Sequence, residues 1–437
     1  VDIRRFSAVH AKRKFVTART LEAYGKHYTI GYPHEEYESG RPQLASPLYD
    51  RLKAKGACFG SKLGWERPNW FAPADTKPHD IYSMGRQNWF EHAGREHAAV
   101  REKAGLFDQS SFAKFDIKGK QATAALESIC ANRIDRPVGA VVYTQMLNSR
   151  GGIECDLTVT RLADNHYYVV TGTGFRNHDF NWILDHAPRG AEFQMRDVTE
   201  EWGTLVLMGP KARAILEAAT GQDLPSQVFP FGQCRELKVA GKKVRALRVT
   251  YVGELGWELH VPVRGICAVY DSLMAAGQPL GLALTGYRAL ESLRLEKGYR
   301  AWSSDITPND TPFEAGLGWA VKMKSDTGFI GREALAQQTL QPLKKMLTGF
   351  TTVRDDIVLV GRETILRDGK FAGYLTSGGY GYTVGKPIGY GYVRNAAGVS
   401  VEHVMSGSYE LVVATEKVKA IPHMGALVDP GNLRVKA

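Results

Sequence analysis

The spacing of apolar and polar positions changes along the chain, and this change divides the chain into two regions. From about residue 85 to about residue 335, segments with apolar residues at helical spacing alternate with segments in which every second residue is apolar. Beyond about residue 340 the helical spacing disappears, and short strands alternate with glycine turns. The pattern predicts an α+β fold for the first region and a small antiparallel barrel or sandwich for the second.

Most of the predicted elements lie in the α+β region. We expect helices at 91–104, 121–131, 175–185, from Pro210 to a stop signal at Gly221, at 266–276 and at 286–297, the last two closed by Gly277 and Gly298. Strands are expected at 112–117, 156–160, 167–171, 205–208, 244–251 and 257–261, with a tight hairpin at 253–256 between the last two. In the barrel region the predicted strands are 346–351, 356–360, 371–375, 388–393 and 409–414.

Residues 1–75 differ from the rest of the chain. They contain few regular apolar periods and many aromatic and turn residues, as in Tyr24-Gly25-Lys26-His27-Tyr28 and Trp65-Glu66-Arg67-Pro68-Asn69-Trp70-Phe71. We therefore expect a loop-rich segment that packs against something larger, followed by a linker from Pro68 to Pro78.

Composition and charge exclude several classes of protein. With 437 residues, 43% apolar and 23% charged, the chain resembles an ordinary globular protein of two or three domains rather than a collagen, a coiled coil or a disordered chain. No apolar run reaches the roughly 20 residues that cross a bilayer, so we expect no membrane partner. The net charge of +10 is dispersed and no nucleic-acid-binding motif accompanies it, which favours attraction of an anionic metabolite over nucleic acid.

Cysteine usage and the first residue bear on the setting of the protein. The five cysteines are few, odd in number and scattered, which is typical of a reducing compartment. The chain begins with Val rather than Met, so we expect it to start after a processing site or inside a longer polypeptide.

Searches for common cofactor and catalytic motifs give negative results. Thr171-Gly172-Thr173-Gly174 follows a predicted strand but lacks the third glycine of a dinucleotide fingerprint. His92 and His97 are not four residues apart, and no Cys-x-x-Cys exists, so we expect no metal site. A Gly-x-Ser-x-Gly nucleophile elbow is also missing. We infer that the chain does not carry out redox chemistry by itself.

Four segments carry the most specific signal. In the stretch from Tyr143 to Val159, the turn Gly151-Gly152 delivers acidic residues to the start of a strand. The other three are Tyr251-x2-Glu254-x-Gly256-Trp257-Glu258, Glu291-Ser292-Leu293-Arg294-Leu295-Glu296-Lys297-Gly298 and Asp305-Ile306-Thr307-x4-Pro312-x-Glu314-Ala315-Gly316-Leu317.

In this order and spacing, the four segments resemble the folate-dependent aminomethyltransferase family, the T-protein of glycine cleavage. The resemblance covers roughly residues 85–430. Residues 1–75 look like the central segment of dimethylglycine and sarcosine dehydrogenases, in which an FAD domain precedes a folate domain. The resemblance implies an oxidase remnant and linker at 1–78, an aminomethyltransferase folate-binding domain at 79–338 and a C-terminal β-barrel at 339–437.

The resemblance also implies roles for single residues. Asp156 falls on the family's catalytic aspartate, and Cys155 replaces the aspartate that usually precedes it. Tyr143, Tyr251, Glu258 and Tyr299 match positions that line the folate pocket. A carboxylate can accept the amino group and ring N–H that a pterin presents side by side, and tyrosine faces suit the ring. Each residue also has an ordinary structural interpretation, as a turn, core or surface residue.

The implied function is capture of a one-carbon unit on tetrahydrofolate, as the folate half of a dimethylglycine or sarcosine dehydrogenase in a bacterial cytoplasm or mitochondrial matrix. FAD would then belong to a missing or separate oxidase domain. Two alternatives stay open: a free-standing aminomethyltransferase and a non-catalytic folate-binding subunit.

One departure from the family is Leu290, where many T-proteins have an arginine. Arg288 is expected to point to a different face of its helix, which leaves open how the glutamate tail of the folate is held.

Overall fold

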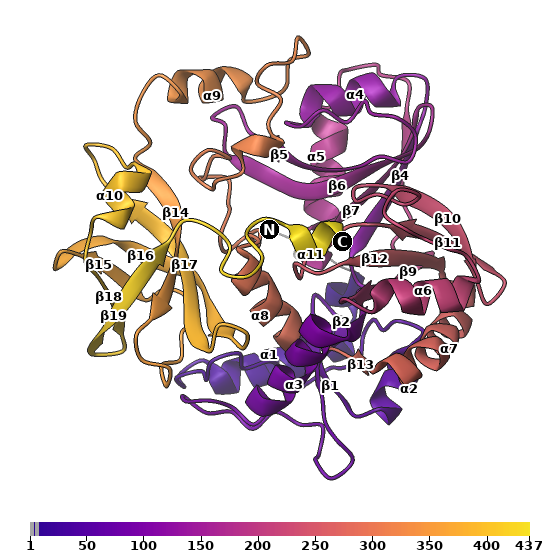
Figure 1. Cartoon of the computed structure of the whole chain (residues 1–437), viewed down its shortest axis with the longest axis horizontal. Helices are drawn as coiled ribbons and strands as arrows, with labels where there is room; N and C mark the ends of the chain where they lie inside the picture. The colour runs from indigo at the N-terminus through magenta and orange to yellow at the C-terminus, as the bar shows by residue number, and fades with distance from the viewer. Residues whose placement is uncertain (1–3, 5–7) are drawn as a thin grey trace.

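Three β-structures surround helix α8 (Tyr287–Lys297) in the computed structural model, which describes Arg4 and residues 8–437 (Figure 1). A five-stranded sheet and a six-stranded sheet lie on one side, and a closed barrel formed by the C-terminal part of the chain lies on the other (Figure 1). This arrangement confirms the predicted α+β fold with a C-terminal barrel. None of the described helices is long and apolar enough to span a bilayer.

The five-stranded sheet is fully antiparallel, with strand order β5-β6-β7-β4-β8. Helices α4 and α5 cover one face, where Phe115 and Leu157 pack against Leu126 and Ile183. The bounds are β4 (Ala113–Lys118), β5 (Val141–Leu147), β6 (Ile153–Ala163), β7 (His166–Thr171), β8 (Gln194–Asp197), α4 (Ala122–Ile129) and α5 (Arg176–His186).

The six-stranded sheet has the order β10-β11-β12-β9-β3-β13, with β13 parallel to β3 at the edge. Helices α6 and α7 cover one face over Trp257 and Leu259, while α3 and α8 cover part of the other around Val206. The bounds are β3 (Ala104–Asp108), β9 (Trp202–Met208), β10 (Cys234–Val239), β11 (Lys242–Leu247), β12 (Gly256–Pro262), β13 (Leu282–Leu284), α3 (Phe90–Glu102), α6 (Ala212–Thr220) and α7 (Ile266–Gly277).

One local prediction in this region was wrong. The strand expected at 244–251 ends at Leu247, and because Leu247 pairs with Glu258, residues 248–255 form a loop rather than a tight hairpin. Helix α7 ends at Gly277, as predicted, although a short 3₁₀ turn follows it and the left-handed residue is Gly281. Gly298, in contrast, does close α8 in a left-handed conformation, which glycine adopts at little cost.

The barrel closes in the order β14-β17-β16-β15-β18-β19. The expected strand at 356–360 is instead a loop: the Glu363 carboxylate accepts the backbone N–H of Val360, and Leu359 is buried in the barrel core. Strands β15 and β19 and the short helices α10 and α11 were missed. The bounds are β14 (Lys345–Thr352), β15 (Thr364–Arg367), β16 (Lys370–Gly381), β17 (Lys386–Arg394), β18 (Tyr409–Val413), β19 (Glu416–His423), α10 (Val401–Met405) and α11 (Leu433–Lys436), with α9 (Arg332–Gln338) before the barrel.

The N-terminal segment is more regular than expected. It contains α1 (Arg13–Lys26), α2 (Tyr49–Ala54), β1 (Ala57–Lys62) and β2 (Trp65–Phe71), so the start of the expected linker is a strand. Pro68 fits there because β1 and β2 form a two-stranded sheet whose register shifts between Cys58 and Phe59, beside Pro68. Residues 1–3 and 5–7 of the predicted first domain lie outside the described residues, and the three-domain division stays a prediction.

Candidate functional site

The two sheets turn polar faces toward one another. Side chains alternate between the faces of a strand, so residues of the five-stranded sheet that are out of phase with its helix-covered core share the other face. Lys114, Thr158 and Tyr143 lie in one row across β4, β6 and β5, with Val170 of β7 between the first two. Asp156 is two residues from Thr158 on the same face.

The opposing face belongs to β9, β11 and β12 of the six-stranded sheet. Glu258 and His260 alternate with the buried core residues Trp257 and Leu259, so their side chains point away from helices α6 and α7. The Tyr168 hydroxyl, from β7, forms a hydrogen bond of 3.1 Å with Nδ1 of His260, and the two rings meet edge to face with centroids 5.3 Å apart. This contact joins the polar faces of the two sheets.

Asp156 lies partly buried beside Tyr143, which comes from the neighbouring strand. Burial raises the pKa of Asp156 to about 7; a hydrogen bond from Tyr143 opposes this rise, and the nearby Asp179 carboxylate adds to it. Burial and the Asp156 charge likewise hold the pKa of Tyr143 well above its usual value. Asp156 can therefore gain or lose a proton close to neutral pH, as a general base requires.

Glu258 lies on the facing sheet among basic groups. Its Oε2 is 3.4 Å from Nε2 of His260, and the side chain keeps 18% of its surface exposed. Lys114 is completely buried and donates hydrogen bonds of 2.8 Å to the carbonyl oxygens of Ser110 and Phe112. Burial lowers the pKa of Lys114 to about 7, against the attraction of Asp108 and Glu258. The charge of Glu258 is thus partly balanced while its carboxylate retains capacity for further donors.

Tyr251 and Tyr299 form an aromatic wall near Asp156. Their rings stack with centroids 5.8 Å apart and planes 15° from parallel, and the Tyr251 hydroxyl donates to the carbonyl oxygen of Arg300 at 3.0 Å. The left-handed turn at Gly298 places Tyr299 here, directly after α8. Burial raises the pKa of Tyr299 to about 12 and that of Tyr251 further, so both remain neutral phenols.

The structure brings some of the predicted site residues together and separates one. Asp156 lies near Tyr143 and within electrostatic range of Tyr251, which stacks on Tyr299. Glu258 interacts instead with Lys114 on β4, two strands away from Asp156 on β6. Two strand spacings amount to about 10 Å, so the two carboxylates occupy opposite ends of the shared polar surface.

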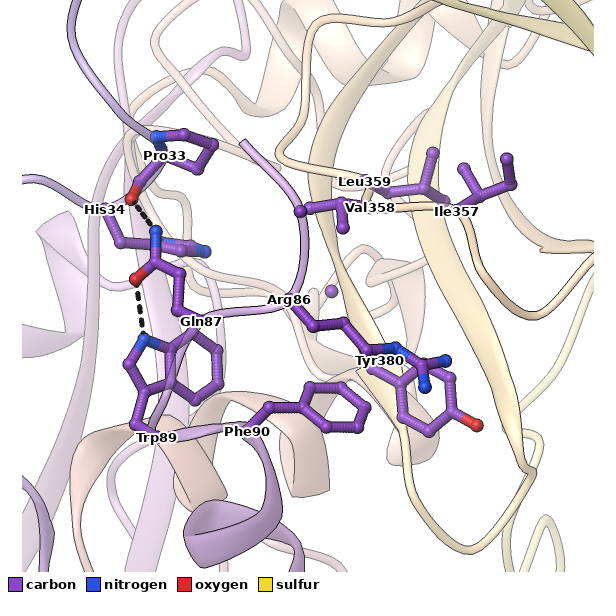
Figure 2. Close-up of a pocket in the computed structure, with 12 residues that line it drawn as sticks. Pro33, His34, Arg86, Gln87, Trp89, Phe90, Ile357, Val358, Leu359 and Tyr380 are labelled. Atoms are coloured by element: carbon purple, nitrogen blue, oxygen red, sulfur yellow. Dashed lines mark hydrogen bonds between the residues drawn. The ribbon is translucent and has the colours of Figure 1, made fainter. Parts of the chain in front are cut away.

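Two cavities lie outside the row of predicted site residues, and the larger one borders it through Trp319. Figure 2 shows a small one, of about 50 Å³, where Arg86 stacks over Phe90 and Tyr380 at 4.4 and 5.0 Å between the start of α3 and the barrel. It contains none of the predicted site residues. A larger cavity, of about 860 Å³, is lined by Trp319, whose ring stacks on Tyr143 at 5.7 Å and leaves 72% of the residue exposed.

One cluster of potential metal ligands exists among the described residues. Atoms of Cys155, His178 and Asp179 lie within 4.8 Å of one another. A search for ligand spacing along the chain could not find it, because it joins β6 to α5. Asp179 is already occupied, since it bonds Nδ1 of His178 at 2.8 Å and accepts the Thr171 hydroxyl.

Sequence reasoning missed two buried polar residues on the polar face. Lys114 lies within a predicted strand, and Gln145 lies two residues after Tyr143, so strand periodicity places it on the same face.

The structure also shows the surroundings of Leu290, the position at which this chain departs from many T-proteins. Leu290 is buried against Leu293, whereas Arg288 stacks over Trp89, just before α3, at 4.8 Å.

Comparison with protein families matches three parts of the chain. Residues 48–325 match the GCVT N-terminal domain, residues 345–429 match the glycine cleavage T-protein C-terminal barrel domain, and residues 1–46 match the FAD dependent oxidoreductase central domain. The chain belongs to the GCVT family. The resemblance inferred from the four motif segments is therefore confirmed.

Relatives of this GCVT-family chain include two dehydrogenases and a transferase. Mitochondrial sarcosine dehydrogenase of Homo sapiens is 37% identical over the whole chain and 52% of its own length, and mitochondrial dimethylglycine dehydrogenase of Rattus norvegicus is 38% identical over 87% of the chain and 44% of its own length. The crystal structure of aminomethyltransferase T of the glycine cleavage system from Bartonella henselae has a TM-score of 0.75 and 27% identity, covering 89% of this chain and 99% of that one. The chain thus spans about half the length of these dehydrogenase relatives and nearly all of the transferase.

Proposed function

We propose that this chain is the folate-dependent part of an N-methylglycine dehydrogenase and captures the one-carbon unit released by demethylation of dimethylglycine or sarcosine as 5,10-methylenetetrahydrofolate. The observation that carries the proposal is the pair of facing polar surfaces, with Asp156 and Tyr143 at one end and Glu258 at the other. Membership of the GCVT family and the names of the two dehydrogenases support the reaction class. A mitochondrial matrix or a bacterial cytoplasm is the compartment we propose.

The residues present fit a reduced pterin. Among the described residues, His260 is the one hydrogen-bond partner of the Glu258 carboxylate, so Glu258 can accept an amino group and a ring N–H together. The stacked Tyr251 and Tyr299 offer an apolar wall for a flat ring. The separation of about 10 Å between β6, which carries Asp156, and β4, whose Lys114 interacts with Glu258, leaves room for the ring between the two carboxylates. Tetrahydrofolate would supply the two nitrogen nucleophiles that accept the carbon.

Asp156 is the residue we propose as catalytic. As a carboxylate it stabilises the positive charge of an incoming methylene-iminium ion, and it takes up the proton released when nitrogen bonds to carbon. Its pKa of about 7 keeps a substantial fraction of the carboxylate charged at neutral pH. Tyr143 donates to this carboxylate and orients it toward the ligand.

A flavin-dependent partner completes the proposal. Residues 1–46 match the central domain of FAD-dependent oxidoreductases, and the chain itself contains no dinucleotide fingerprint. On and after α1, Tyr24, Tyr28 and Ile30 expose 72%, 84% and 85% of their surfaces, which favours contact with another apolar surface. We propose that this surface contacts a flavin-dependent part that oxidises the N-methyl group.

The experiment combines binding with capture. Tetrahydrofolate binding is measured on this chain by calorimetry, and capture is measured with the chain joined to its flavin-dependent part, as the ratio of 5,10-methylenetetrahydrofolate to free formaldehyde. Asp156→Asn is expected to retain binding and to lower capture about 10²–10⁴-fold. Asp164→Asn is the matched control, because the Asp164 side chain, just beyond β6, is 89% exposed.

Three outcomes decide between the alternatives. Absence of tetrahydrofolate binding rejects the proposal altogether. Binding without capture in the wild type supports a non-catalytic folate-binding subunit, and activity on an aminomethylated lipoyl carrier without a flavin part supports a free-standing aminomethyltransferase. Normal capture by Asp156→Asn removes the role assigned to Asp156.

A further inference from the structure

Gln145 stands out among the buried residues beside the candidate site. It lies in the middle of β5, is fully buried, and pairs directly with Asp156 across the β5–β6 ladder. Neither Oε1 nor Nε2 of its side chain has a hydrogen-bond partner of normal geometry among the residues that the structure describes. Because a buried, unpaired carboxamide destabilises a fold, packing alone does not explain it.

Two polar residues, Tyr143 and Asp156, share the face of the sheet on which this carboxamide lies. Strand periodicity puts Gln145, Tyr143 and Asp156 on one face, since Tyr143 is two residues away on β5 and Asp156 is the directly opposite residue on β6. The Gln145 amide favours the charged form of the Tyr143 hydroxyl, and that hydroxyl in turn favours the charged form of Asp156. The hydroxyl therefore lies between the amide and the carboxylate.

We propose that Gln145 is a positioning residue that donates its amide N–H to the Tyr143 hydroxyl and so holds the hydroxyl proton against the Asp156 carboxylate. The proposal rests on the role of Asp156 in the proposed function. A donor on the phenolic oxygen makes the phenol a stronger donor, because hydrogen bonds in a chain polarise one another. Long apo-state contacts of this kind shorten when a ligand closes the site.

The charged and polar groups around Asp156 make its pKa depend on the hydrogen bonds from Gln145 to Tyr143 and from Tyr143 to Asp156. The like charge of Asp179, from α5, raises the pKa of Asp156, and the Asp156 charge in turn raises that of Tyr251 in the loop after β11. Arg300, which follows α8, acts on Tyr143. Tyr143 is the hydrogen-bond donor that favours the Asp156 charge. Weakening that donor is therefore expected to raise the pH at which Asp156 becomes active.

The test replaces Gln145 by methionine, which keeps the length but removes the donor. Asp156 is titrated by ¹³C NMR in this chain, with its resonance identified by loss in Asp156→Asn, and the pH profile of one-carbon capture is recorded in parallel. Gln145→Met is expected to raise the Asp156 pKa and the acidic limb of the profile by about 0.5–1 unit, and to leave the urea midpoint unchanged or higher. Gln145→Leu is the second replacement should the methionine variant not fold.

Two comparisons separate positioning from a general packing role. In a Tyr143→Phe background, Gln145→Met is expected to cause no further shift, because the chain is already interrupted. Thr144→Val is the matched control: Thr144 is equally buried on β5 but faces the opposite side and accepts the Asn132 N–H at 3.0 Å, so it should lower stability without moving the titration.

The results can overturn the proposal in distinct ways. An unchanged Asp156 titration in Gln145→Met, an equal shift in Thr144→Val, or a full additional shift in the Tyr143→Phe background would each reject it. Since the NMR titration needs no folate, a wild-type chain that captures no one-carbon unit contradicts the proposed function and leaves the positioning role to be decided by the titration.

Discussion

Two carboxylates of the molecule, Glu296 and Asp156, lie in surroundings that move their pKa values in opposite directions. Glu296, at the end of α8, contacts Arg101 at 3.0 Å and His97 at 3.3 Å, and accepts the backbone N–H of Thr383 at 2.7 Å. Burial alone would raise its pKa, but hydrogen bonding from His97 and the Arg101 charge lower it to about 2. Asp156 has one such donor, Tyr143, and its pKa rises to about 7.

The same family motifs therefore contain two kinds of carboxylate: those whose ion pairs stabilise the fold, and one that can exchange a proton during the reaction. Arg294, from the same motif as Glu296, donates to Asp305 at 2.7 Å, and Glu254 contacts Arg101 at 2.8 Å. These fully paired ions connect α8 to α3 and to neighbouring segments, so they fix the framework. The under-paired Asp156 keeps a proton affinity that chemistry can use.

The largest expected effect comes from breaking the paired region. Glu296→Gln removes one of the two carboxylates that pair with the buried Arg101, leaving only Glu254. It is expected to reduce the free energy of unfolding by up to roughly 3–5 kcal/mol, measured by urea denaturation. Asp156→Asn is the contrasting variant and is expected to keep or raise stability. If both variants lose stability equally, the distinction between the two regions is wrong.

A smaller effect is expected at the far end of the polar surface. Glu258→Gln replaces a charged acceptor and is expected to weaken tetrahydrofolate binding by about 1.5–3 kcal/mol, roughly 10–100-fold, with little change in the urea midpoint. Calorimetry provides the measurement. Glu236→Gln on β10 is the control, because that side chain is 59% exposed and pairs only with Lys243 among the described residues. Equal binding by both variants would remove Glu258 from the folate site.

The pH dependence of stability should have opposite signs in the two regions. The folded-state pKa of Asp156 is about 7 against 3.8 for the free side chain, so its stabilising protonated form is lost and stability falls as pH rises from 3.8 towards 7. The folded-state pKa of Glu296 is about 2 against 4.5, so its contribution is present above 4.5 and is lost as pH falls towards 2.

Variants isolate these two slopes. The stability advantage of Asp156→Asn over wild type should grow by about 1–2 kcal/mol between pH 4 and pH 7, after allowance for solvent screening. The stability deficit of Glu296→Gln should shrink as pH falls below 4.5. Urea denaturation at stepped pH measures both. The stability of each variant minus that of the wild type should rise with pH for Asp156→Asn and fall with pH for Glu296→Gln. A change of the same sign in both variants would contradict the assignment.

The smallest effect provides the baseline. Arg354 contacts Asp356 and Glu416 at 2.7 Å each, but all three side chains are more than half exposed. Solvent and salt screen such pairs, so Arg354→Ala should not measurably change the urea midpoint. A clearly lower urea midpoint would show that exposed ion pairs also stabilise this fold. The contrast between Glu296 and Asp156 would then depend on charge pairing in general rather than on burial.

The sequence by itself determined the fold class, the family and most helices and strands of the α+β region. Periodicity succeeds there because each of these elements buries one face, and the spacing of apolar residues records that face. It failed at 356–360, where the apolar residues fill the end of the barrel core as a loop, and at 248–255, where a long connection replaced the expected hairpin. At 356–360 the Glu363 carboxylate accepts the Val360 N–H, a contact that the spacing of apolar residues does not record.

Only the tertiary structure decided which polar residues meet. The sequence named Asp156 and Glu258 through a resemblance, but their positions on two facing sheets, and the isolation of Gln145 beside Asp156, depend on strand order and register. The same motifs contain Glu296, whose partners Arg101 and His97 lie on α3, far away along the chain. Burial and pairing set the proton affinity of a carboxylate, and both depend on neighbours that the chain brings together only when it folds.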